Sequence, residues 1–338
     1  MGVAFRGQVT RSIPVEESSQ VGQVRREALG LANTAGFGEI DGGRVALVAT
    51  EVATNVLRHG HGGQVLLSLV QGRNGLGVEV CGIDQGPGFS LSRCLPDGYS
   101  TAGSPGQGLG AIQRQSQVFE VWSDDRGAVV VSRIYAADAP CNDFGYGALR
   151  VPMRRQAVCG DAWLLGWDGP QLVAVLIDGL GHGLQACEAA EEGLAAAADA
   201  PGLAADELLA RMHVCMSRTR GGAAAVFRHD SDSGQAWFAG VGNIAGAVHE
   251  AGGASRGLAS HPGIVGGQYR RAPAFSMPAA AGSLLVMHSD GLQSRWTLGQ
   301  YEGLAHRHPA LVVAVLLRDF DRGRDDVSLI AVRLGERT

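Results

Sequence analysis

The 338-residue sequence contains no Cys-x-x-Cys pair, although it has six cysteines. They stand singly at positions 81, 94, 141, 159, 187 and 215. Several lie in apolar stretches, which is typical of buried, reduced thiols. One string, HVCMSRTRGG, weakly suggests a cysteine-based phosphatase loop, but only four residues separate Cys215 from Arg220 and the string has a helical pattern. Core packing is the better interpretation of Cys215.

Long apolar runs and an excess of basic residues are also lacking. No segment approaches the length of a membrane span, and the start MGVAFRGQVT has no signal-peptide core. Arg6 stands where a myristoylation signal needs Ser or Thr. The chain has 28 Lys plus Arg against 33 Asp plus Glu, a net charge of -5. We therefore expect a cytoplasmic protein with neither a membrane nor a nucleic acid as partner.

The chain is long enough for two domains, and its 45% hydrophobic content can build two cores. A cluster of Pro, Gly and Asn over 136–148 marks the best linker. We expect domains over 1–135 and 149–338 and an α+β fold. Helices are predicted over 21–36, 41–60, 111–116, 184–200, 205–219 and 308–320, and strands over 64–71, 75–84, 117–123, 128–136, 148–155, 161–169, 171–178, 223–230, 235–243, 245–250, 283–290 and 327–334.

Five aspartates of the second half adjoin apolar runs and small residues. They are Asp161 in CGDAW, Asp178 in IDGLGHG, Asp290 in MHSDGL, and Asp325 and Asp326 in RDDVSL. Carboxylates at about 4 Å repel by roughly 4 kcal/mol per pair at an effective dielectric near 20. If the tips converge they need cations, and oxygen-only ligation favours Mg²⁺ or Mn²⁺ over Zn²⁺.

A second set of polar residues lies on the predicted helix 41–60. Glu51 and Asn55 are one turn apart, Arg58 and His59 follow, and these four share one side. The valines at 45, 48, 52 and 56 occupy the other side and would face a sheet. Glu51 can orient or deprotonate a nucleophile, and Asn55 can ligate Mg²⁺. For this helix alone, a solvated face is the better interpretation.

Glycine-rich loops follow. Asp84 ends a strand before Gly86 and Gly88, and Gly106, Gly108 and Gly110 precede a helix. A carboxylate can accept a hydrogen bond from the exocyclic amine of adenine, and a helix N-terminus suits phosphates. A Rossmann site does not fit, because no early βαβ unit carries these glycines.

In this order and spacing, the motifs of residues 8–135 resemble the GHKL ATPases with their Bergerat α/β sandwich. TEVATNVLRHG and DQGPGF are similar to the serine kinases of anti-sigma-factor and stressosome switches. The resemblance implies Glu51 as catalytic base, Asn55 as Mg²⁺ ligand and Asp84 as adenine-binding residue. Gly86, Gly88, Gly106, Gly108 and Gly110 would shape the ATP phosphate and lid loops. One departure is the short loop between Phe89 and Gly106, which has few basic residues.

Residues 149–335 resemble the SpoIIE and RsbX branch of the PPM phosphatases, which have an α/β/β/α sandwich. The strings are CGDAW, IDGLGHG, FAGVGNIAGAV, HPGIVG, MHSDGLQSRW and RDDVSL. The resemblance implies Asp161, Asp178, Asp290 and Asp325 as ligands of two Mg²⁺ or Mn²⁺ ions. Gly179 would add its carbonyl, and Asp326 would orient ligands or water. His182 is either the acid that protonates the leaving oxygen or a structural histidine of the turn.

Together the two resemblances imply a bacterial signalling switch. Its phosphatase would act on a phosphoserine or phosphothreonine of a STAS-type antagonist protein, and its first domain would bind ATP with Mg²⁺ and act as a serine kinase. In one alternative, the first domain is a non-catalytic module that binds a sigma factor or the antagonist. In another, it senses ATP and regulates the phosphatase.

Overall fold

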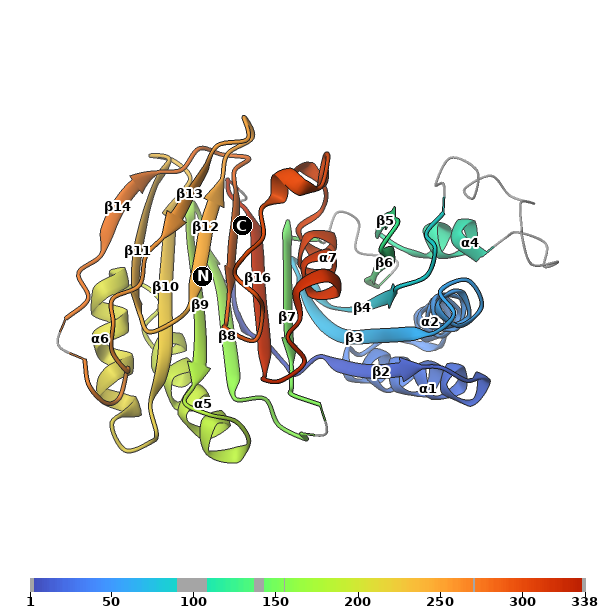
Figure 1. Cartoon of the computed structure of the whole chain (residues 1–338), viewed down its shortest axis with the longest axis horizontal. Helices are drawn as coiled ribbons and strands as arrows, with labels where there is room; N and C mark the ends of the chain where they lie inside the picture. The colour runs from blue at the N-terminus through green and yellow to red at the C-terminus, as the bar shows by residue number, and fades with distance from the viewer. Residues whose placement is uncertain (1–2, 90–107, 137–142, 155, 270, 336–338) are drawn as a thin grey trace. The chain divides into compact units, whose positions relative to one another are not determined.

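A computed structural model describes residues 3–89, 108–136, 143–154, 156–269 and 271–335 (Figure 1). Contacts divide the chain into two compact units, each described separately below. The first unit comprises Thr10–Phe144 and Ala314–Asp319. The second comprises Met1–Val9, Gly145–Val313 and Phe320–Thr338.

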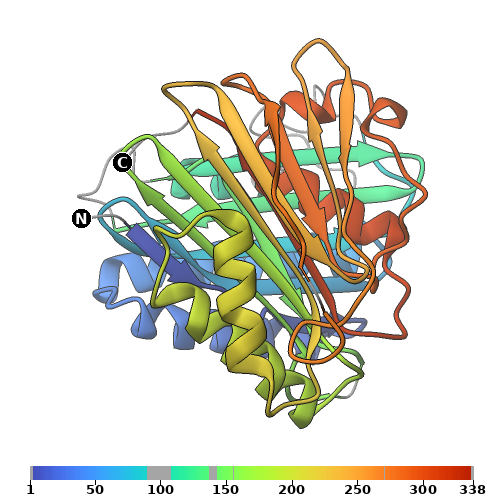
Figure 2. The same ribbon diagram turned by 90° about the vertical axis from the view of Figure 1, so that its left-hand side faces the viewer.

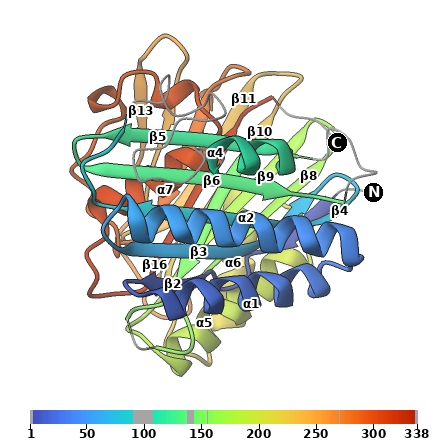
Figure 3. The same cartoon turned by 90° about the vertical axis from the view of Figure 1, so that its right-hand side faces the viewer.

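In the first unit, one antiparallel sheet carries helices on one face. The strand order is β2(Arg11–Val15), β3(Gly63–Gly72), β4(Gly75–Asp84), β6(Gly127–Ile134) and β5(Val118–Asp124). Helices α1(Ser18–Thr34) and α2(Glu39–Arg58) cover one face of this sheet, as Figure 3 shows. α4(Gly108–Gln115) contacts α2. Its first residues adjoin the polar side of α2, which places Gly108 near Glu51.

The pattern of α2 explains its placement. Val45, Val48, Val52 and Val56 are buried, as the predicted apolar stripe requires. They pack with strand residues such as Val65 in one hydrophobic cluster. Gly82 of β4 faces Val52, so a side chain there would press on the helix. This close packing fixes the opposite side of α2, where Glu51 and Asn55 are half-buried.

The second unit contains two antiparallel sheets. The first has the order β1(Val3–Arg6), β8(Asp161–Asp168), β9(Gln171–Gly179), β10(Gly222–Asp230), β11(Gln235–Val241) and β14(Phe275–Pro278). The second has the order β13(Ser255–Leu258), β12(Ala245–His249), β15(Leu284–His288), β16(Val327–Arg333) and β7(Tyr146–Val151). Rings from both sheets meet: Phe5 of β1 lies 5.1 Å from Tyr146 of β7 between ring centroids.

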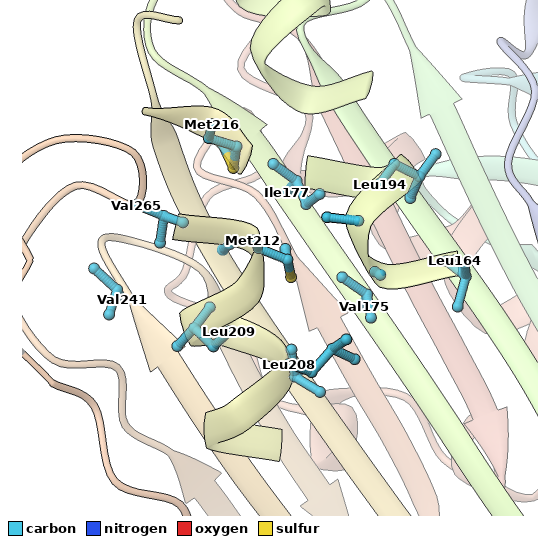
Figure 4. Close-up of a cluster of buried hydrophobic side chains, with 14 of the residues drawn as sticks. Leu164, Val175, Ile177, Leu194, Leu208, Leu209, Met212, Met216, Val241 and Val265 are labelled. Atoms are coloured by element: carbon cyan, nitrogen blue, oxygen red, sulfur yellow. The ribbon is translucent and has the colours of Figure 1, made fainter. Parts of the chain in front are cut away.

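Helices cover the first of these sheets. α5(Leu184–Ala198) contacts β8 and β9, and α6(Ala205–Met216) contacts β10 and β11 (Figure 2). Figure 4 shows the resulting core, in which Leu208, Leu209 and Met212 of α6 face the strands. Burial of each such side chain contributes about 1.5–3 kcal/mol. α7(Pro309–Phe320) begins against β7, where a side chain on Gly147 would overlap Ala310.

The expected mixture of helices and sheets is confirmed, including all six predicted helices. Strand β7 begins at Tyr146, two residues earlier than predicted, and overlaps the expected linker. Strand β1 pairs with β8, so contacts group the first nine residues with the second unit. The predicted boundaries at 135 and 149 stay predictions. Among the described residues, no helix is long and apolar enough to cross a membrane.

Candidate functional site

In the first unit, the polar side of α2 meets the start of α4. A Cβ built on Gly108 would lie 3.2 Å from Glu51 Oε2 and 3.5 Å from Asn55 Oδ1. The helix N-terminus thus lies directly against the predicted base and the predicted Mg²⁺ ligand. Backbone N–H groups at such a terminus favour anions. Gly110 lies in the same helix, whereas Gly106 lies outside the described residues.

Asp84, the last residue of β4, is held by the backbone. Its Oδ1 accepts hydrogen bonds from the N–H groups of Gly86 at 2.9 Å and Ala128 at 3.1 Å. Burial raises the pKa of this carboxyl, and the two backbone hydrogen bonds oppose that rise. Both bonds use Oδ1. They fix the orientation of the carboxylate and leave Oδ2 without a backbone donor from these two residues.

The glycines around Asp84 are required by close approach. A side chain on Gly60 would overlap the Asp84 side chain, and one on Gly86 would lie 2.9 Å from the Gly60 Cα. Gly88 has a φ of +69° and packs against the carbonyl of Asp124. The glycine motif of the sequence therefore has a physical basis here: the glycines let three chain segments meet at the Asp84 carboxylate.

In the second unit, strand pairing brings two predicted metal ligands face to face. Asp161 opens β8 and pairs with Asp178 near the end of β9. Asp161 is 1% exposed. Strands β8 and β9 belong to the first sheet of this unit. In the second sheet, Asp290 follows β15, and Asp325 and Asp326 precede the neighbouring strand β16. Thus both sheets of this unit contribute aspartates.

Electrostatics shows that these carboxylates influence one another. Burial raises the pKa of Asp178, and the charges of Asp161, Asp290, Asp325 and Asp326 raise it further, to about 8. The pKa of Asp161 is also raised by burial, and a hydrogen bond from Ser289 opposes this rise. Mutual repulsion of this kind is relieved by a cation or a proton.

The side-chain spacing is wider than metal ligation requires. Within the described ranges, no three His, Cys, Asp or Glu side chains lie close enough together to hold one metal ion. Charges act over longer distances than ligand bonds do, so the mutual pKa effects and this spacing are compatible. The oxygen donors fit a hard cation in their chemistry. The ligand set therefore stays a prediction.

Asp326 has a different environment from the other aspartates. Its Oδ1 accepts the Met153 N–H at 2.6 Å and its Oδ2 accepts the Gly160 N–H at 2.7 Å. Both oxygens are thus engaged by backbone next to Asp161. This arrangement agrees with an orienting role for Asp326 better than with direct ligation.

Glycines explain why the aspartates occur beside small residues. A side chain on Gly160 would press on Asp326 Oδ2, and one on Gly291 would overlap the Asp326 carbonyl. A side chain on Gly179 would overlap the carbonyl of Ala186 in α5. The backbone can approach this closely only without a Cβ.

Two contributors were missed from the sequence. Asn243 donates from Nδ2 to Asp290 Oδ2 at 2.6 Å. Ser289 donates from Oγ to Asp161 Oδ2 at 2.7 Å, and its Oγ accepts the N–H of Ser328. Their signal was present, since both lie in quoted motif strings beside a glycine or an aspartate. Because Asn243 and Ser289 are neutral, however, no charge pattern in the sequence marked them as site residues.

His182 lies on the turn after Asp178, between Gly181 and Gly183, which both have positive φ. Its side chain is exposed and has no hydrogen bond to any described residue. A capping role for its ring is therefore not observed. The role as proton donor remains a prediction.

The two units correspond to two known families. Residues 14–134 match the histidine kinase-like ATPase domain. Residues 168–335 match the family of stage II sporulation protein E, SpoIIE. Serine/threonine-protein kinase RsbT of Bacillus subtilis (strain 168) is 32% identical over 92 residues, which are 27% of this chain and 69% of RsbT. The chain therefore has a histidine kinase-like ATPase domain at its N-terminus and a SpoIIE-family domain at its C-terminus. It joins a GHKL-like ATPase domain to a SpoIIE-type PPM phosphatase domain.

The SpoIIE-type domain has relatives of its own. Phosphoserine phosphatase RsbX of Bacillus subtilis (strain 168) is 26% identical over 141 residues, covering 40% of this chain and 69% of RsbX. A crystal structure of RsbX contains magnesium; its TM-score is 0.49, at 19% identity over 54% of this chain and 92% of that one. A solved structure from work on the bacterial stressosome has a TM-score of 0.52 at 28% identity, over 56% of this chain and 98% of that chain.

Proposed function

We propose that this protein removes phosphate from a phosphoserine or phosphothreonine of a STAS-type antagonist protein, and that its ATPase domain binds Mg²⁺-ATP and acts as the opposing serine kinase. The observation that carries the phosphatase half is the pairing of Asp161 with Asp178, whose pKa values are raised by burial and by the charges of neighbouring aspartates. Carboxylates arranged in this way disfavour their own charged state unless cations are bound. The similarity to RsbT and RsbX supports a role in partner switching.

In the proposed reaction, two Mg²⁺ or Mn²⁺ ions would be held by Asp161, Asp178, Asp290 and Asp325, together with the carbonyl of Gly179. Bound metals of this kind lower the pKa of water and stabilise charge on phosphorus. Asn243 fixes the orientation of Asp290, and Ser289 fixes that of Asp161. Asp326 holds the backbone on both sides of the site. His182 is placed on an exposed turn from which it can donate a proton to the leaving serine oxygen.

In the ATPase domain, Asp84 Oδ2 would accept a hydrogen bond from the adenine amine. Asn55 would hold Mg²⁺, and the start of α4 would face the phosphates. Glu51 would deprotonate the hydroxyl of the acceptor serine, because it lies beside Gly108 at this helix end. The placement of Glu51, Asn55 and Gly108 is the observation that supports kinase activity over simple nucleotide sensing.

Labelling with γ-phosphate-labelled ATP tests both halves. Wild-type protein, Glu51→Ala and Asp178→Asn are each incubated with a STAS-domain partner. We expect Asp178→Asn to accumulate label on the partner and Glu51→Ala to transfer none. Asp168→Asn is the control for Asp178, since Asp168 is exposed and ends β8 at its opposite end from Asp161. If Asp178→Asn labels no partner, the kinase proposal is rejected and the ATPase domain is a binding or sensing module.

A further inference from the structure

Arg220 lies beside the turn that follows Asp178, although no motif of the sequence assigns it a role. Its Nη1 lies 3.4 Å from the point where a Cβ on Gly181 would stand. The side chain is exposed and forms no ion pair with any residue that the structure describes. An exposed arginine is ordinary, but one packed against the Asp178 loop without a carboxylate partner needs an explanation.

The backbone holds Arg220 rigidly at this position. Before it, the Thr219 hydroxyl donates to the Met216 carbonyl at 2.7 Å and accepts the N–H of Gly221 at 3.0 Å. After it, Gly222 and Val265 exchange backbone hydrogen bonds at 3.0 and 2.8 Å. Gly221 has a φ of +70°, which favours glycine. The backbone of Arg220 therefore belongs to a turn that hydrogen bonds on both sides hold in place.

The same turn is tied to the aspartate loop. The N–H of Leu180 donates to the carbonyl of Gly221 at 2.9 Å. Strand register pairs Gly222 with Gly179 and Ala223 with Asp178. Arg220 thus lies just beyond the strand end that faces Asp178, on the side where the exposed turn Leu180–Gly183 meets solvent.

The positive charge of Arg220 suits this position for binding an anion. Five carboxylates and two dications carry a net charge of -1, so a further positive group beside the proposed metal site would favour binding of a phosphate monoester dianion. Arginine presents a planar fork of donors that matches phosphate oxygens. An arginine without a carboxylate partner keeps these donors available for a ligand.

We propose that Arg220 binds the phosphate group of the substrate at the entrance of the phosphatase site. This inference rests on the proposed phosphatase function and deepens it, since it names the residue that recognises the phosphomonoester. Arg220 contacts the oxygens of the phosphate and takes no part in proton transfer. Binding of this kind stabilises the bound substrate and the transition state alike, so its loss raises KM and leaves kcat nearly unchanged.

The test uses the full chain with Mn²⁺, p-nitrophenyl phosphate as substrate and inorganic phosphate as inhibitor. We expect Arg220→Ala to raise both KM and the inhibition constant for phosphate by about 10- to 100-fold, with kcat changed less than about 3-fold. Arg220→Lys should recover part of the loss, because it restores the charge without the fork. Arg218→Ala, which removes an exposed arginine two residues away, should match wild type.

A binding measurement separates this role from a structural one. Titration of inorganic phosphate into the Mn²⁺-loaded protein should show weaker binding for Arg220→Ala, while the affinity for Mn²⁺ and the Tm stay unchanged. If wild type hydrolyses the ester and Arg220→Ala keeps the same KM and phosphate affinity, the Arg220 proposal alone is overturned. If wild type neither hydrolyses the ester nor binds phosphate, both proposals are overturned.

Discussion

Asp84 of the ATPase domain and Asp161 of the phosphatase domain are both buried carboxylates at strand ends, but their neighbours differ. Asp84 faces backbone N–H groups, which stabilise its charge and oppose the effect of burial on its pKa. Asp161 faces other aspartates, and their charges add to the effect of burial. Backbone donors oppose the effect of burial on Asp84 without cancelling it, whereas the repulsion around Asp161 is relieved only by cations or protons. A neutral substitution should therefore have different consequences at the two sites.

Replacement of an aspartate at the phosphatase site should give the largest effect. We expect Asp178→Asn to lower phosphatase kcat by at least about 100-fold, because it removes a proposed ligand of the metal ions that would stabilise the transition-state charge. The same change should raise the Tm of the metal-free protein, because it removes repulsion from four neighbours. A stabilisation of 1 kcal/mol corresponds to about 2–4 °C for a domain of this size. Calorimetry in a chelator and steady-state kinetics measure the two effects.

Asp168→Asn is the matched control for this prediction, because Asp168 is an exposed aspartate on β8. It should leave both kcat and Tm unchanged. A metal-free Asp178→Asn protein less stable than wild type would contradict the repulsion that distinguishes this site from Asp84.

The pH dependence of stability offers a second way to break the comparison. The pKa of Asp178 is about 8 in the folded chain, above the ordinary aspartate value. Between about pH 4 and pH 8 the folded state thus binds more protons than the unfolded state, so stability falls as pH rises. We expect the Tm of metal-free wild type to fall over this range relative to the Tm of Asp178→Asn. Mn²⁺ should reverse the loss, by about 2.7 kcal/mol at 100 times its Kd.

Denaturation scans from pH 4 to pH 8, with chelator or with Mn²⁺, measure this effect. Asp178→Asn serves as control, since its metal-free scan should be flatter than that of wild type. A difference in metal-free Tm between wild type and Asp178→Asn that stays constant from pH 4 to pH 8 would show that the pKa of Asp178 is not raised.

The hydrogen bond from Asn243 to Asp290 should have an intermediate effect. We expect Asn243→Ala to weaken Mn²⁺ binding by about 10- to 100-fold, as is typical for groups that orient metal ligands. Asn243 is exposed and adjoins β12, so the fold should persist. Titration calorimetry gives the affinity, and Asn243→Asp should lose affinity less if charge matters more than orientation. Unchanged Mn²⁺ affinity in Asn243→Ala would remove Asn243 from the site.

The places of many candidate residues in the fold could be predicted from sequence, because charged residues and glycines recur at strand ends, whereas their roles stay predictions. β4 ends at Asp84 as predicted, and the valine stripe of α2 fixed which side carries Glu51. Asn243 and Ser289 did not follow, since a neutral side chain shows its partner only once strands pair. The pairing of β1 was not predicted for a similar reason: its four residues carry little pattern, and their partner β8 lies over 150 positions away.

Asp84→Asn should give the smallest effect and sharpen the comparison most. Asparagine keeps an oxygen that accepts the N–H groups of Gly86 and Ala128, which both bind Oδ1. Its amide would replace Oδ2 and present donors to the adenine amine, itself a donor. We therefore expect an unchanged Tm and about a 10-fold weaker ATP affinity, as follows from one unsatisfied polar contact.

Asp125→Asn, which changes an exposed aspartate in the turn between β5 and β6, is the control. Fluorescent-nucleotide titration measures the affinity, and phosphatase rates with and without ATP show whether the nucleotide also regulates the second domain. If Asp84→Asn lowers the Tm while ATP affinity is unchanged, Asp84 serves the fold alone and the contrast with Asp178 lies in stability, not in ligands.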